Sequence, residues 1–241
     1  MDSSLFCNEK PGKLVPINVG GQAFIPDPLP PEWKLPTLLW SQVAEAVRVI
    51  GVLDGIGRVL PNPAILLRPT EDREAIQSSA LEGTYATLKE LLLFEMEPAD
   101  AARDTDETNR FREVYNYRLA IQHATTSPLP ICLRLIRELH EILMKGVRGH
   151  QKNPGMFRTV QVAIGSNHRF VPPPPNRVLE CMDSLEKFIH SEPTIHPLIS
   201  CFFVHYQFET IHPFTDGNGR TGEGPQRHEP RPCQPGDLQV T

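Results

Sequence analysis

A nine-residue run from His212 to Arg220, HPFTDGNGR, contains the residue types that phosphate chemistry needs. His212 has an ordinary pKa of about 6.5, so it can take a proton from a hydroxyl near neutral pH. Asp216 offers a hard oxygen ligand for Mg²⁺, and the backbone N–H groups of residues 217–219 can turn toward an anion. Arg220 can add charge-assisted hydrogen bonds to phosphate oxygens. The run therefore predicts attack of a hydroxyl group on a nucleotide phosphate.

The elements that must position this run have mostly helical periodicity. The stretch directly before it, 195–211, has almost no polar face, so we expect that helix at the centre of the core. Gly55 is expected to stop the first helix, while Thr70 and Thr84 are expected to cap two others. The predicted helices are 37–54, 64–67, 70–82, 84–97, 110–123, 131–143, 177–190 and 195–211.

Two stretches are not helical in pattern. Residues 11–36 contain seven prolines, which lack backbone donors, so we expect an extended arm without a regular element. Phe24, Trp33 and Leu35 are expected to pin this arm onto a helical surface. The β-branched alternation of 156–165, followed by 169–171, predicts a small β-hairpin.

Composition limits the class of protein. The 241 residues, 39% of them hydrophobic, can bury one sizeable core. A net charge of -5 argues against nucleic acid as the main partner, because no dominant cationic surface is available. Five cysteines without a CxxC pair predict a reducing compartment and no zinc site. No signal peptide and no stretch of roughly 18 apolar residues is present, so we expect a cytoplasmic protein without membrane contact.

The nine residues match, without a mismatch, the Fic-family consensus of His, Pro, Phe, any residue, Asp or Glu, Gly, Asn, Gly, Arg. The resemblance covers most of 35–222, including the runs 53–55, 60–63 and 78–84. It implies an all-α fold, a Fic-type helical core with a small β-hairpin flap. The implied organisation is an extended arm over 1–34, an N-terminal helical region over 35–125 and the core over 126–223.

By this resemblance the protein is similar to enzymes that transfer AMP from ATP to a Ser, Thr or Tyr hydroxyl of another protein. His212 would be the base and Asp216 would hold Mg²⁺, while a target protein would lie along the flap as an added strand. The resemblance is also compatible with a homodimer. The implied ATP-binding residues are Gly217, Asn218, Gly219, Arg220, Thr221 and Gly222, and the implied docking residues are Val160, Gln161, Val162, Ala163 and Ile164.

Upstream, Ser78, Glu82 and Gly83 resemble a second motif of the family. In family members with this motif, the glutamate occupies the space of the ATP γ-phosphate and pairs with a second arginine of the loop. The resemblance therefore implies that Glu82 inhibits the enzyme. Without the loop, Glu82 would be a surface charge at a helix end.

The chain departs from the family after Gly222. The second arginine is expected at position 223, where this chain has Glu223, and residues 224–241 have four prolines and no helical period. We expect 224–241 to be an irregular, disordered tail that results from a truncation or a shifted reading frame, and expect impaired ATP binding. Two alternatives stay open: a Fic relative that transfers another phosphate-containing group, and a non-catalytic remnant that acts as a protein-interaction module.

Overall fold

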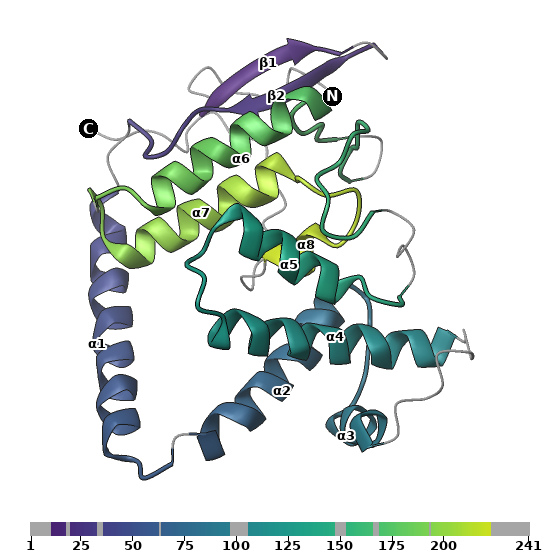
Figure 1. Cartoon of the computed structure of the whole chain (residues 1–241). Helices are drawn as coiled ribbons and strands as arrows, with labels where there is room; N and C mark the ends of the chain where they lie inside the picture. The colour runs from purple at the N-terminus through teal and green to yellow at the C-terminus, as the bar shows by residue number, and fades with distance from the viewer. Residues whose placement is uncertain are drawn as a thin grey trace.

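Eight helices and one two-stranded sheet make up the part of the chain that the computed structural model describes, namely 11–17, 20–32, 36–62, 64–96, 106–147, 153–165, 169–192 and 194–222 (Figure 1). This confirms the predicted helical fold. The strands are β1 (Gly12–Pro16) and β2 (Gln22–Pro26). The helices are α1 (Thr37–Val59), α2 (Ala64–Leu81), α3 (Leu88–Met96), α4 (Asp106–Thr126), α5 (Leu133–Leu143), α6 (Pro175–Ile189), α7 (Pro197–Ile211) and α8 (Asn218–Gly222).

Two clusters of buried apolar side chains form the core. One joins α2, α3, α4 and α5 around Leu91, Val114 and Leu143. The other joins β2, α6 and α7 around Met182, Ile211 and Phe214. Because α5 contacts both α4 and α6, it connects the two clusters and places the α7–α8 loop beside the N-terminal helices (Figure 1).

Several predicted helix limits were wrong. Helix α1 continues through Gly55 and Gly57 to Val59, and α2 is one helix that includes Pro69. The Thr70 hydroxyl donates to the Leu66 carbonyl one turn earlier, so it does not cap a new helix. Glycine and proline weaken a helix by a finite free energy, which tertiary and sequence context can offset.

The predicted cap at Thr84 was also wrong. Helix α3 begins at Leu88, where Thr87 and Glu90 form a reciprocal capping box: the Thr87 N–H donates to Glu90 Oε2, and the Glu90 N–H donates to Thr87 Oγ1. The Thr84 hydroxyl instead donates to Glu113 on α4.

The proline-rich arm contains regular structure, contrary to the prediction. Strands β1 and β2 pair antiparallel, with Leu14 opposite Phe24, and Phe24 is 3% exposed. The Phe24 N–H donates to the Val171 carbonyl, so the arm also supports the segment after the flap. Pro16 and Pro26 stand at strand ends, where a missing donor is tolerated.

The flap is less regular than predicted. Among the described residues of 156–171, strand pairing is limited to one antiparallel bridge between Ile164 and Phe170, closed by two backbone hydrogen bonds of 2.8 and 3.1 Å. Of the five predicted docking residues, Val160 is 52% exposed, and the Gln161 side chain donates to the Pro172 carbonyl. The backbone of 160–163 takes no part in strand pairing with other described residues.

Helix α7 is central on one face only. Ile199, Phe208 and Ile211 are buried, whereas Phe202 and Tyr206 are 69% and 54% exposed. The prediction that this helix lies at the centre of the core therefore holds for one of its faces. Helix α1 has no buried residue, although its apolar side chains include Trp40. Across the described ranges, no helix combines the length and the apolar character needed to cross a membrane.

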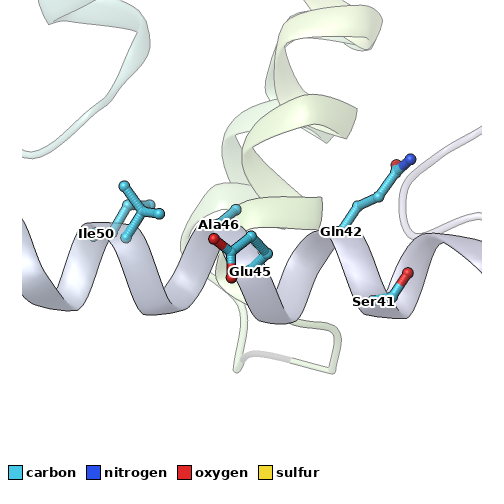
Figure 2. A pocket seen from close by; sticks show the side chains of 6 residues that line it. Ser41, Gln42, Glu45, Ala46 and Ile50 are labelled. Carbon is cyan, nitrogen blue, oxygen red and sulfur yellow. The ribbon is translucent and has the colours of Figure 1, made fainter.

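One shallow hollow lies along α1 (Figure 2). All of its lining residues belong to this helix, so it is a surface groove away from the His212–Arg220 loop. The lining residues are Ser41, Gln42, Glu45, Ala46, Val49 and Ile50. Trp33, Leu35, Glu223 and the predicted tail 224–241 lie outside the described residues.

Candidate active site

His212 is the residue at which α7 ends and the candidate loop begins. Its φ of 49° and ψ of 62° place it in the left-handed region, and its N–H donates to the Phe208 carbonyl at 2.9 Å. A residue other than glycine rarely adopts this conformation, which costs of order 1–3 kcal/mol and is concentrated at functional sites. The turn moves the chain sharply off the helix axis and leaves the His212 side chain 22% exposed beside the loop.

Burial and the nearby Arg158 guanidinium lower the pKa of His212 to about 4, against the opposing effects of the Glu209 backbone carbonyl and the Asp216 carboxylate. The imidazole is therefore neutral at pH 7. A neutral imidazole can accept a proton, which is the state that the predicted base requires.

Arg158 fixes the start of the loop, a role that the sequence reasoning missed. Its side chain donates to the carbonyl oxygens of His212, Ile211 and Pro173, and its backbone N–H donates to the Pro213 carbonyl. It is 3% exposed, and burial lowers its pKa to about 10. In the sequence, Arg158 appears only as a charged residue at the edge of an apolar segment. That pattern does not indicate what the side chain contacts.

His140 on α5 fixes the middle of the loop, and it was also missed. Its ring stacks on Phe214 with centroids 3.7 Å apart, and it is 2% exposed. Nδ1 accepts from the Gly155 N–H, so Nε2 must carry the proton and donate to the Asp216 carbonyl at 2.9 Å. Burial lowers the pKa of His140 and favours this neutral form. Its place on the apolar face of the predicted helix, four residues after Ile136, was the available signal.

Asn218 holds the loop closed from within. Its Oδ1 accepts from the Phe214 N–H and its Nδ2 donates to the Phe214 carbonyl, both at 2.8 Å, and it is 2% exposed. The side chain is therefore used inside the loop, and only the backbone N–H of Asn218 remains suited to the predicted phosphate contact.

Gly217 has a φ of 73°, and a Cβ there would come within 2.8 Å of Met144 Sδ, so both the turn and the close approach require glycine.

Thr221 and Gly222 close α8 onto the rest of the site. The Thr221 hydroxyl donates to the Gly217 carbonyl at 2.7 Å, and the Gly222 carbonyl contacts His205 Nδ1. The contacts of these two residues with ATP phosphates stay a prediction.

Asp216 fits a magnesium site that is completed by substrate oxygens. Its Oδ1 accepts from the Gly217 N–H at 2.9 Å, which fixes the carboxylate at the loop. Among the described residues no group of three or more His, Cys, Asp or Glu side chains could hold a metal ion by itself. Mg²⁺ commonly binds one or two carboxylates together with phosphate oxygens, so a single aspartate is compatible with this cation.

The structure brings Glu82 to the loop. A Cβ placed on Gly219 would lie 2.2 Å from Glu82 Oε1, so the carboxylate sits directly over the Gly219 backbone. The same loop backbone was predicted to cradle phosphate. Ser78, also part of the predicted motif, is 5% exposed, and its hydroxyl donates to Glu74 on its own helix. Gly83 follows directly after Glu82, in the turn beyond α2.

Arg220 has a carboxylate partner that the sequence reasoning missed. Its Nη1 lies 3.3 Å from Glu113 Oε2 of α4, and the two side chains are 10% and 15% exposed. Glu113 lies more than 100 residues before Arg220, so only the packing of α4 beside the loop brings them together.

Glu209 adds a further carboxylate one turn before His212. Its Oε2 lies 3.9 Å from His212 Nδ1. Burial, followed by repulsion from the Glu82 carboxylate, raises the pKa of Glu209 to about 7. The Glu82 carboxylate therefore disfavours the charged form of Glu209.

This pKa predicts how Glu209→Gln changes stability. Folded Glu209 keeps its proton up to about pH 7, whereas an unfolded glutamate loses its proton near the ordinary pKa of 4.5. Between these two pH values, Glu209 therefore lowers the free energy of unfolding more and more as the pH rises. We expect Glu209→Gln to raise the free energy of unfolding at pH 8 by about 1 to 2 kcal/mol, with solvent exposure of the side chain taken into account.

At pH 5 the gain should nearly vanish, as urea unfolding at both pH values would show. Glu192→Gln, on the exposed surface, is the matched control. A gain of equal size at pH 5 and pH 8 would contradict the assignment.

Comparison with known proteins matches most of the chain to one family. The model described as "Fic/DOC family N-terminal" matches residues 40–126, and "Fic/DOC family" matches 130–223. "Protein adenylyltransferase Fic" of Drosophila erecta is 30% identical over 179 residues, which are 70% of this chain and 34% of that protein. The protein of the same name from Drosophila persimilis is 34% identical over 152 residues, 60% of this chain and 28% of the relative.

Solved structures show the same fold. A Fic family protein from Desulfovibrio desulfuricans G20 superposes with a TM-score of 0.61 at 28% identity, covering 80% of this chain and 57% of that chain. Fic-1 from C. elegans has a TM-score of 0.60 at 24% identity, covering 77% and 56%, and supports the fold alone. The chain spans about a third of the length of the curated relatives named above.

Proposed function

Because the chain belongs to the Fic family, we propose that it is a protein adenylyltransferase, which transfers AMP from ATP to a Ser, Thr or Tyr hydroxyl of another protein. The observation that carries this proposal is the placement of a neutral His212 at the entrance of the 212–220 loop, with Arg158 and His140 holding its backbone. The proposal is also supported by similarity to proteins named protein adenylyltransferase Fic.

The proposed reaction uses His212 as general base. The target hydroxyl oxygen forms a bond to the α-phosphorus of ATP, its proton passes to the His212 imidazole, and the bond from the α-phosphorus to the leaving pyrophosphate breaks. Arg220 and the backbone N–H groups of 218 and 219 would bind phosphate oxygens, whereas the Gly217 N–H already donates to Asp216 Oδ1. Asp216 would hold Mg²⁺, which neutralises phosphate charge when it is bound.

We further propose that Glu82 inhibits this activity. The support is its position over Gly219, where its carboxylate takes up space beside the loop backbone that ATP phosphates would need. A carboxylate and a phosphate about 4 Å apart repel by roughly 1 to 4 kcal/mol, depending on the effective dielectric constant. ATP binding would then require the end of α2 to move.

The target protein is proposed to lie along the flap at 160–164. The support is a backbone over 160–163 that pairs with no described strand, and a half-exposed Val160. An extended peptide can add to such an edge through main-chain hydrogen bonds. Alternate side chains of the peptide would then face the site.

Glu82→Gly tests the proposed function. We expect this substitution to raise the ATP affinity about tenfold or more and to produce label on protein from ATP labelled at the α-phosphate, since one repulsive charge is removed from the phosphate site. Filter-binding and gel autoradiography with candidate target lysate would measure both. Glu71→Gly, at a partly exposed position of α2, controls for weakening of the helix that precedes Glu82.

The position of the label separates the alternatives. Label retained only from the γ-phosphate would indicate transfer of another phosphate group. No ATP binding and no transfer by a folded Glu82→Gly chain would support the non-catalytic remnant, and would contradict the proposed function.

A further inference from the structure

Glu113 lies between the turn that carries Glu82 and the 212–220 loop, the two segments that the proposed inhibition brings together. Its Oε2 is 3.3 Å from Arg220 Nη1, and the same oxygen accepts a 2.6 Å hydrogen bond from Thr84 Oγ1. Arg220, Glu113 and Thr84 are 10%, 15% and 8% exposed, so water screens these contacts weakly. One carboxylate oxygen therefore joins the turn after α2 to the loop arginine.

Thr84 anchors the turn 82–84 through two hydrogen bonds. The Thr84 N–H donates to the Ser79 carbonyl at 2.8 Å, which ties the turn to the last residues of α2. The Thr84 hydroxyl ties it to Glu113 on α4. Two residues before Thr84, Glu82 reaches Gly219, the residue before Arg220.

No ion pair between Glu82 and another residue is present in the described ranges. Its carboxylate is also close enough to Glu209 to raise the pKa of that group, so the local electrostatics oppose its position. Within the described part of the chain, the constraint that holds Glu82 over Gly219 is therefore not an ion pair. The anchored turn provides such a constraint.

We propose that Glu113 is a positioning residue that seats Glu82 over Gly219 through Thr84 and orients Arg220 at the phosphate loop. This inference rests on the proposed function, because it concerns the regulation of the same site. Glu113 controls how firmly Glu82 occupies the loop. When Glu82 leaves, the same carboxylate keeps the Arg220 guanidinium in place for a phosphate.

Amide hydrogen exchange on the nucleotide-free protein tests the anchor directly. Thr84→Val keeps the side-chain shape but removes the hydroxyl, and Glu113→Gln removes the acceptor charge. We expect each variant to speed exchange over 79–84 about tenfold, while α5 stays protected. Thr84→Val removes the bond that ties the turn to α4, and Glu113→Gln removes the charge that strengthens it.

Matched changes elsewhere separate a local effect from a general loss of stability. Thr125→Val removes an exposed hydroxyl on α4, and Glu180→Gln removes an exposed carboxylate on α6. Neither should change exchange over 79–84. Unchanged exchange over 79–84 in both Thr84→Val and Glu113→Gln would overturn the proposal.

ATP binding tests the consequence for the site. Thr84→Val should raise ATP affinity about fivefold in the chain that contains Glu82, and change it by less than about twofold in the Glu82→Gly chain. In the Glu82→Gly chain, Glu113→Gln should lower ATP affinity about fivefold, since Arg220 loses its anchor. Equal gains from Thr84→Val in both chains would overturn the link through Glu82. Absence of ATP binding by the Glu82→Gly chain would count against the proposed function, while the exchange measurement still decides the role of Glu113.

Discussion

Replacing His212 by asparagine in the Glu82→Gly chain should lower AMP transfer by about 10²- to 10⁴-fold, the range that a general base contributes. The imidazole is neutral at pH 7 because burial and Arg158 lower its pKa to about 4, so the lost group is one that was ready to accept a proton. Asparagine is chosen because it tolerates the left-handed conformation in which His212 is held. Label transferred from α-labelled ATP to protein is the measurement.

ATP affinity provides the control for this variant. The base acts on the target hydroxyl, so the Kd for ATP should change by less than about threefold while transfer is lost. His196→Asn, at the distant N-terminal cap of α7, should retain transfer. A His212→Asn chain that transfers AMP within about tenfold of its parent would remove His212 from the mechanism.

Replacing Arg158 by methionine should lower the free energy of unfolding by about 3 to 5 kcal/mol, since methionine fills similar space but leaves buried carbonyl oxygens without donors. The side chain donates to carbonyls of Val160, Pro173, Ile211 and His212, and it makes no ion pair with a described carboxylate. The midpoint and slope of urea unfolding measure the loss.

Arg158→Lys should give an intermediate loss, because a single ammonium group cannot reach all the carbonyls that the guanidinium contacts from its different nitrogens. The matched control is Arg134→Met on α5, whose guanidinium is exposed and pairs only with Glu138 one turn later. That change should cost less than about 1 kcal/mol. An Arg158→Met chain with a loss as small as that of Arg134→Met would show that the clamp does not stabilise the loop.

Local sequence determined the helices and the contents of the loop. The amphipathic spacing of 131–143 and 177–190 predicted α5 and α6 to within two residues, because each helix buries one continuous stripe. The run His212 to Arg220 is contiguous, so its chemistry could be inferred without knowing the fold. Prolines and glycines were less informative: α1 passes through Gly55, and the proline-rich arm forms β1 and β2.

Only the tertiary structure decided which residues far away in the sequence contact the 212–220 loop. Arg158, His140 and Glu113 reach the loop from the flap, α5 and α4, and no periodicity in the sequence relates them to it. The sequence of α7 is apolar on every side, so it does not indicate which face is exposed. Hydrophobic patterning specifies that a face needs burial, whereas the partner and the polar contacts depend on how helices far apart in the chain pack together.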